Sequence, residues 1–142
     1  MLVQETPKIQ IRKAVNLDFD AIARIQARTM VASDHYVNSL DEEAEFQRLF
    51  PRVTGYFERT HNPGYSLAAR AIYLVVHKKQ IIGFVAGHCS TRMKCTAELP
   101  WIFVLPQWQR KGVGTSLLQP LKQWFQKHKS TKVIVDAPPE ER

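Results

Sequence analysis

The pattern of apolar and polar positions predicts both strands and helices along this chain. Alternation with a period of two is typical of a half-buried strand, whereas apolar residues three or four positions apart form one face of a helix. Ile9 and Ile11 alternate with polar neighbours, and Ile22 and Met30 fall on one helical face. The whole pattern predicts strands at 9–14, 71–77, 80–90, 97–105 and 132–136, and helices beginning near 18, 39 and 113. Only Lys78-Lys79 separates the second and third strands, which predicts an antiparallel hairpin.

Capping and proline signals refine the helices. Asp18 is placed to cap the first helix, with Leu17 and Ile22 as a hydrophobic staple. Pro51 disfavours helical geometry in the residue before it, so we expect the second helix to break or kink there. Pro120 removes a backbone hydrogen bond from the third helix and predicts a kink.

Length and composition limit the class of protein. The chain has 142 residues, enough for one domain with a buried core, and we expect a single domain over 1–142. No segment resembles a signal peptide and no apolar run is long enough to span a bilayer, so we expect a cytoplasmic protein without membrane association. Cys89 and Cys95 are then expected to be reduced thiols, and their spacing does not indicate a zinc site.

The segment 96–125 carries the clearest chemical signal. A mostly apolar strand runs into Gln109-Arg110-Lys111-Gly112-Val113-Gly114, and an amphipathic helix follows. The two glycines allow a sharp bend and close approach of a ligand to the backbone. The first N–H groups of a helix lack internal partners and carry partial positive charge, to which Arg110 and Lys111 add full charges. This combination predicts a cradle for a diphosphate.

Two familiar phosphate-binding motifs do not fit this turn. A P-loop has four residues between its glycines and ends in Gly-Lys-Ser/Thr, and the dinucleotide fingerprint needs a third glycine where this chain has Leu117. The spacing Gln109-x-x-Gly112-x-Gly114, with the pair Ala97-Glu98 ahead of it, resembles instead the pyrophosphate loop of the GNAT superfamily of N-acetyltransferases. A glycine turn that only joins a strand to a helix is the alternative.

The resemblance implies the fold. It implies an α/β (α+β) architecture with a mixed, mainly antiparallel sheet flanked by helices and a splayed central strand pair. The family normally continues with another helix and two strands, which this sequence is expected to lack. The strand at 132–136 would then have an open edge and two apolar faces, so we expect self-association there, as a homodimer or as aggregation.

The resemblance also implies that acetyl-CoA binds as cosubstrate, without a metal. The pantetheine arm would pair with the backbone of Ile102, Phe103 and Val104, in a gap beside the strand at 132–135. The diphosphate would lie on the loop formed by Gln109, Arg110, Lys111, Gly112, Val113, Gly114 and Thr115.

Glu98 is the candidate catalytic residue. In the family an amine attacks the thioester directly, and an amine with a pKa near 10.4 must first lose a proton. The position of Glu98 ahead of the loop resembles that of the catalytic glutamate in the histone acetyltransferase branch, where a carboxylate accepts this proton through water. The alternative is a surface glutamate paired with Arg92 or Lys94. We expect His88 to be a surface or packing residue.

Charge leaves other functions open. The net charge of +7 suits a polyanionic ligand but also nucleic acid, although no basic run exceeds two residues and nucleic acid is therefore the less favoured partner. A GNAT-like module that binds coenzyme A without catalysis is a further alternative. Five acids would attract a cationic amine or simply belong to a helix N-terminus, where Asp41–Glu43 are favourable: Asp34, Asp41, Glu42, Glu43 and Glu45. The identity of the amine acceptor is not encoded in any motif.

Overall fold

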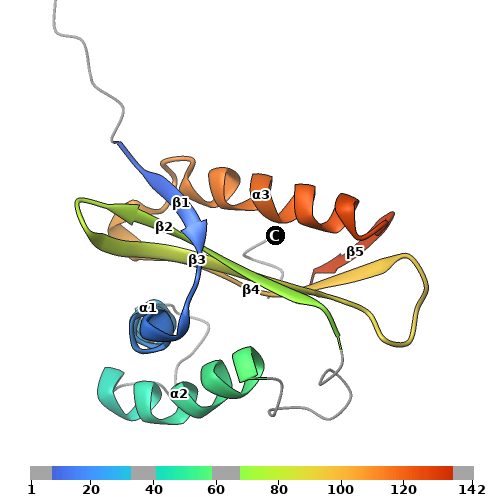
Figure 1. Cartoon of the computed structure of the whole chain (residues 1–142). Helices are drawn as coiled ribbons and strands as arrows, with labels where there is room; N and C mark the ends of the chain where they lie inside the picture. Colours follow the sequence, from blue (N-terminus) through green and yellow to red (C-terminus); the bar gives the residue numbers. More distant parts are fainter. Residues whose placement is uncertain (1–7, 33–40, 59–67, 136–142) are drawn as a thin grey trace, which may run out of the picture.

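The computed structural model of the chain describes residues 8–32, 41–58 and 68–135. One five-stranded sheet has two helices on one face and a third helix on the other (Figure 1). This arrangement confirms the predicted class of a mixed sheet flanked by helices. The strands are β1 Gln10–Lys13, β2 Arg70–His77, β3 Gln80–Cys89, β4 Thr96–Val104 and β5 Lys132–Val135, and the helices are α1 Phe19–Val31, α2 Glu42–Glu58 and α3 Val113–Lys127.

The order of strands in the sheet is the order in the chain, β1-β2-β3-β4-β5. The first four are antiparallel, and β5 is parallel to β4 because α3 carries the chain back across the sheet. The hairpin predicted at Lys78-Lys79 is present, with both lysines in the left-handed region at φ 48° and 67°. Two-residue hairpin turns favour this backbone geometry because it matches the twist of the strands.

A β-bulge interrupts the pairing of β3 with β4. Between the pairs Ala86–Trp101 and His88–Glu98, β3 has one residue but β4 has two, one of which is Pro100. A bulge accommodates proline because the extra residue leaves the ladder of hydrogen bonds. The bulge also keeps the side chains of Glu98 and Trp101 on the same face of the sheet.

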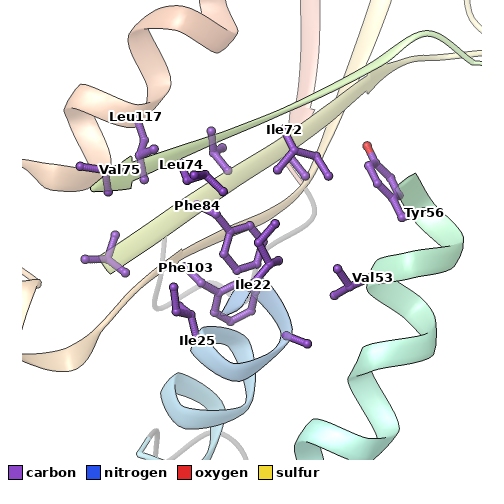
Figure 2. Packing of buried hydrophobic residues seen from close by; sticks show 14 of the residues in the cluster. Ile22, Ile25, Val53, Tyr56, Ile72, Leu74, Val75, Phe84, Phe103 and Leu117 are labelled. Carbon is purple, nitrogen blue, oxygen red and sulfur yellow. The ribbon is translucent and has the colours of Figure 1, made fainter. Parts of the chain in front are cut away.

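The core is divided between the two faces of the sheet. On the α1 and α2 face, Phe84 lies at the centre and packs against Phe103 with ring centroids 5.7 Å apart (Figure 2). On the α3 face, Leu117 and Leu121 are fully buried. Burial of each such side chain contributes about 1.5–3 kcal/mol, which makes these layers the main source of stability.

The start of α1 differs from the prediction. Leu17 is 93% exposed, so the staple with Ile22 does not form. The carboxylate of Asp18 makes no capping hydrogen bond to α1 and instead accepts two from Arg12, at 2.8 and 2.9 Å, and one from the N–H of Val15 at 2.7 Å. A 3-10 turn, Asn16–Asp18, lies between the strand and the helix and changes the direction of both side chains.

Neither proline ends its helix. Of the predicted break or kink at Pro51, the break does not occur, because α2 continues through the proline, and α3 likewise continues through Pro120. An interior proline costs about 3 kcal/mol. The burial of Leu49 and Val53, on either side of Pro51, offsets that cost.

Candidate active site

The open edge of β4 is the first part of the candidate site. β5 pairs with β4 only from Thr96 to Leu99, so residues 100–104 have no partner strand on that side within the described chain. This is the splayed strand pair that the resemblance to the GNAT superfamily implied. An unpaired strand edge presents backbone N–H and C=O groups to an extended ligand.

Alternation decides which backbone groups face the open edge. The N–H of Leu105 donates to the carbonyl of Ile82 at 2.9 Å, so by antiparallel alternation Phe103 also directs its backbone towards β3. Ile102 and Val104 direct theirs to the open side. Of the three residues assigned to pantetheine, Phe103 therefore contributes its buried ring to the core and not its backbone to the cleft.

The loop after β4 has the geometry of an anion cradle. Arg110 and Gly112 are in the left-handed region, at φ 62° and 80°, and no side chain caps the N-terminus of α3. The N–H groups of Val113, Gly114 and Thr115 have no partner within the described residues. Three free N–H groups at the positive end of a helix favour an anion.

The two glycines serve different purposes. A Cβ atom on Gly112 would meet nothing within 4 Å, so its positive φ is what selects glycine there. A Cβ on Gly114 would lie 3.8 Å from Cδ1 of Ile102, an ordinary contact. The start of α3 therefore lies directly beside the open edge of β4.

Two loop residues are braced by protein contacts. The side-chain amide of Gln109 donates to the carbonyl of Val104 at 3.0 Å, which fixes the loop to the end of β4. The ammonium of Lys111 lies 5.3 Å from the ring of Trp108, which in turn packs on His77. Arg110 is exposed, and both cations directly precede the free N–H groups in the sequence.

Glu98 lies on β4 and faces the layer of α1 and α2. Its Oε2 is 2.7 Å from Nε2 of His88, and Nδ1 of His88 is 2.9 Å from the hydroxyl of Tyr56 on α2. The side chain of His88 is 3% exposed and that of Glu98 is 18% exposed. Of the two expectations for His88, the surface position is wrong because the residue is buried, and the partner of Glu98 is His88, not Arg92 or Lys94.

Burial keeps His88 neutral. Desolvation lowers the pKa of His88 below its ordinary value, the hydrogen bond with Glu98 opposes this shift, and the positive charge of Arg70 adds to it. A neutral imidazole has one donor and one acceptor nitrogen, assigned here from the hydrogen-bond network. An ionised Glu98 only accepts, so Nε2 of His88 donates to it and Nδ1 accepts from Tyr56.

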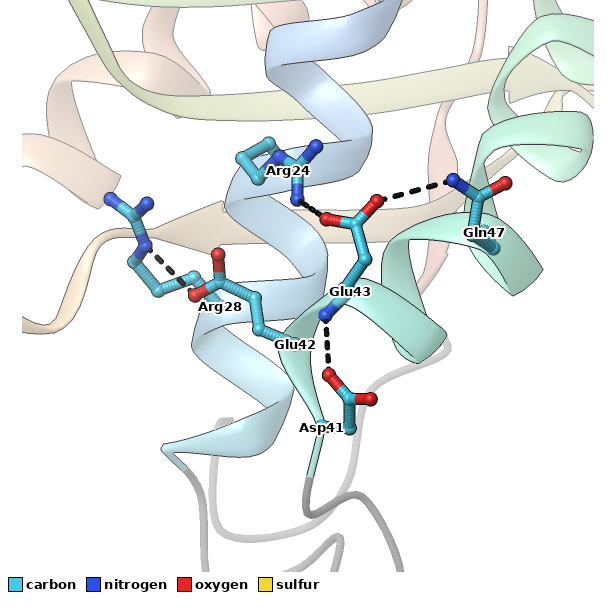
Figure 3. Close-up of polar contacts among 6 residues, drawn as sticks. All are labelled: Arg24, Arg28, Asp41, Glu42, Glu43 and Gln47. Carbon is cyan, nitrogen blue, oxygen red and sulfur yellow. Dashed lines mark hydrogen bonds and ion pairs between the residues drawn. The ribbon is translucent and has the colours of Figure 1, made fainter.

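The acids at the start of α2 are already paired. Glu43 accepts from Arg24 at 2.7 Å and Glu42 from Arg28 at 3.1 Å, which ties α2 to α1 (Figure 3). Glu45 pairs with Arg48 within α2. These contacts favour a structural role for the acids at the start of α2 over the attraction of a cationic acceptor. Asp34 lies outside the described residues.

Other site chemistries find no support in the described parts of the chain. There, no cluster of histidine, cysteine and acidic residues could hold a metal ion. Cys89 and Cys95 are not joined by a disulfide there. None of the helices in ranges 8–32, 41–58 and 68–135 is long and apolar enough to cross a membrane.

Comparison with known proteins agrees with this geometry. The family model described as acetyltransferase (GNAT) family matches residues 32–140. The PaiA N-acetyltransferase of Thermoplasma acidophilum, solved with coenzyme A, is 17% identical with a TM-score of 0.60, covering 87% of this chain and 75% of its own. The aminoglycoside N-acetyltransferase AAC(6')-Iy, also solved with CoA, is 16% identical with a TM-score of 0.61, covering 99% and 84%.

A third solved structure is the ribosomal-protein-alanine N-acetyltransferase of Brucella melitensis, 14% identical with a TM-score of 0.61, covering 94% of this chain and 85% of its own. At these identities the structures show a shared fold. No curated protein matches the chain. The family match covers most of the chain, and its loop, helix and splayed strands are in place: this chain belongs to the GNAT family of acetyltransferases.

Proposed function

We propose that this protein transfers the acetyl group of acetyl-CoA to a primary amine by direct attack of the amine on the thioester. The observation that carries the proposal is the open edge of β4 beside the uncapped N-terminus of α3. Two structurally similar N-acetyltransferases were solved with coenzyme A, which supports this choice of cosubstrate.

Each part of coenzyme A has a matching surface. The diphosphate is placed on the N–H groups of residues 113–115, with Arg110 and Lys111 beside it. The pantetheine arm pairs with the carbonyl of Ile102 and the N–H of Val104. The carbonyl of Val104 is already taken by Gln109, so the arm extends from the loop towards Pro100.

The chemistry then needs a base and an oxyanion donor. Glu98 accepts the proton of the amine through a water molecule, and the new C–N bond forms as the C–S bond breaks. Pro100 has no N–H and Trp101 directs its N–H to β3, so Ile102 is the backbone donor of residues 100–102 for the developing oxyanion. Release of a thiolate with a pKa near 8.5 is uphill by about 2 kcal/mol at pH 7, and solvent then protonates it.

Two other functions compete with this proposal. A non-catalytic module would bind coenzyme A but acetylate no amine, and a nucleic-acid-binding domain would bind DNA with a steep salt dependence and ignore coenzyme A. Titration calorimetry with coenzyme A, followed by acetyl transfer to a panel of small amines, peptides and aminoglycosides, separates the three. Binding without transfer to any amine in the panel would overturn the proposal.

A further inference from the structure

We infer that His88 and Tyr56 are positioning residues that hold Glu98 in one rotamer as an ionised base. The inference deepens the proposed function and rests on it. The two hydrogen bonds, of 2.9 and 2.7 Å, run in one line from Tyr56 through His88 to Glu98. Nothing in the sequence motif of the loop requires either residue.

The direction of the hydrogen bonds is the first argument. The Tyr56 hydroxyl donates to Nδ1, which leaves the proton of the neutral ring on Nε2, and Nε2 donates to Glu98. In both hydrogen bonds the donor lies on the side away from Glu98 and the acceptor on the side towards it. A hydrogen bond given to a charged acceptor stabilises the charged form, so the chain favours ionised Glu98.

Exposure shows which end of the chain meets substrate. Tyr56 is 5% exposed and His88 is 2% exposed, whereas the carboxylate end is partly open. In a nucleophilic triad the hydroxyl is the accessible group and the carboxylate is buried behind the histidine. The order is reversed here, so Tyr56 cannot act as a nucleophile. Oε1 of Glu98 has no partner within the described residues and is available to water.

The surroundings of the histidine favour the neutral ring. Among residues 8–32, 41–58 and 68–135, the titratable and charged groups known to face His88 are Tyr56 from α2, Glu98 from β4 and Arg70 from β2. Arg70 lies over the ring of Tyr56 at 4.8 Å and donates to its backbone carbonyl at 2.6 Å. Arg70 thus holds Tyr56 in place and opposes a second proton on His88.

Tyr56 is also fixed from its other side. Its ring packs against Trp101 with centroids 5.0 Å apart. Trp101 faces α2 because the bulge in β4 resets the alternation after Glu98. The bulge thereby places both the carboxylate and the residue that supports its hydrogen-bond chain on one face.

Tyr56→Phe is the sharpest test because it removes one hydroxyl and keeps the ring. Without the Tyr56 hydroxyl, only Glu98 still favours the Nε2–H tautomer of His88, so the donor to Glu98 is fixed less firmly. We expect kcat to fall about two-fold to ten-fold, the range for a hydrogen bond between neutral groups, with an unchanged KM for acetyl-CoA. His88→Leu should lose at least as much, and His88→Gln, which keeps a donor, should recover part of the loss.

The pH profile separates positioning from simple loss of stability. Loss of the donor removes a charge-assisted hydrogen bond from the carboxylate of Glu98, so the acidic limb of kcat should move to higher pH in Tyr56→Phe and His88→Leu. Tyr73→Phe is the matched control, since Tyr73 is half-buried on β2 but takes no part in the hydrogen bonds that link Tyr56, His88 and Glu98. The pH profile of this variant should match that of the wild type. Nitrogen-15 NMR of the His88 ring should show the Nε2–H tautomer in wild type and a mixture in Tyr56→Phe.

The outcomes distinguish the two proposals. If wild type acetylates an amine while Tyr56→Phe and His88→Leu keep its acidic limb and its kcat, the positioning role is overturned and the proposed function stands. If wild type acetylates no amine in the panel, the proposed function fails and the positioning role fails with it. A shifted acidic limb together with the tautomer change supports the inference.

Discussion

Gly87 of β3 lies so close to Phe125 of α3 that a Cβ atom on the glycine would be 2.6 Å from Cζ of the ring. Gly87 is opposite the bulge of β4, between the residue pairs Ala86–Trp101 and His88–Glu98. The absence of a side chain at this one position lets α3 pack flat on the sheet. The same helix presents its N-terminus to the loop, so this contact helps to set the position of the anion cradle.

Gly87→Ala should therefore overpack the α3 face. We expect a loss of about 1–3 kcal/mol in the free energy of unfolding, measured by urea denaturation. Gly114→Ala is the control, because its Cβ would meet only Ile102 at 3.8 Å, and its unfolding midpoint should change far less. Combining Gly87→Ala with Phe125→Leu should cost less than the sum of the two single changes, because the smaller side chain makes room for the new methyl.

Gly112→Val should abolish tight binding of coenzyme A. The residue has φ 80°, which strains a β-branched side chain, and the valine would lie where the diphosphate approaches the free N–H groups. Calorimetry should show affinity reduced at least about ten-fold, the effect of losing one or two charge-assisted hydrogen bonds. Equal affinity in a variant with native circular dichroism would show that the loop is not the diphosphate site.

Glu98→Gln should reduce acetyl transfer at neutral pH and leave coenzyme A affinity nearly intact. The amide keeps the shape of the side chain and its hydrogen bond to His88 but cannot accept the proton of the amine. The deficit should shrink as the pH approaches the pKa of the amine, where less deprotonation is needed. A pH–rate profile identical to that of wild type would remove Glu98 from the mechanism.

Asp18→Asn should destabilise the fold at neutral pH. The hydrogen bonds from Arg12 are the main cause that lowers the pKa of Asp18 below its ordinary value of 3.8, and the N–H of Val15 adds to it. A carboxyl with a lowered pKa stabilises the fold above its ordinary pKa, and this contribution is lost as the pH falls through the lowered value. We expect a cost of about 1.5–3 kcal/mol at pH 7 that diminishes below pH 4.

Urea denaturation midpoints measured from pH 7 down to pH 2 test whether the stability contribution of Asp18 is lost as the pH falls. Asp20→Asn is the matched control, since Asp20 is exposed on the first turn of α1 and makes no hydrogen bond among those that hold Asp18. A difference between Asp18→Asn and wild type that is constant over the whole pH range would contradict an ionic contribution.

Local signals were sufficient for much of this fold. The hairpin at Lys78-Lys79, the strand before Gln109 and the helix after Gly112 depend on residues close in sequence, so periodicity and turn chemistry predicted them. The continuous α2 did not follow from local rules, because burial of its apolar face against the sheet outweighs the unfavourable effect of Pro51.

The anion cradle was predictable from the sequence. For the candidate base, the sequence indicated Glu98 but not its hydrogen-bond partners. The cradle is a contiguous run, and its chemistry is that of the backbone. The partner of Glu98 depends on a bulge that shifts the register by one residue, which places His88 opposite it. Tyr56 reaches the pair only through the docking of α2, 32 residues earlier in the chain than His88, and no local pattern indicates such a contact.

The direct connection of the paired strands β2, β3 and β4 has a consequence for folding kinetics. Contacts between sequence neighbours close short loops, and chains rich in such contacts fold quickly. Glu98 and His88 are only 10 residues apart, so their hydrogen bond can form as soon as β3 and β4 pair. Pulsed hydrogen exchange should find amides of β3 and β4 protected before those of β5. The chemically important pair is then assembled early in folding, and the cleft beside it is closed last.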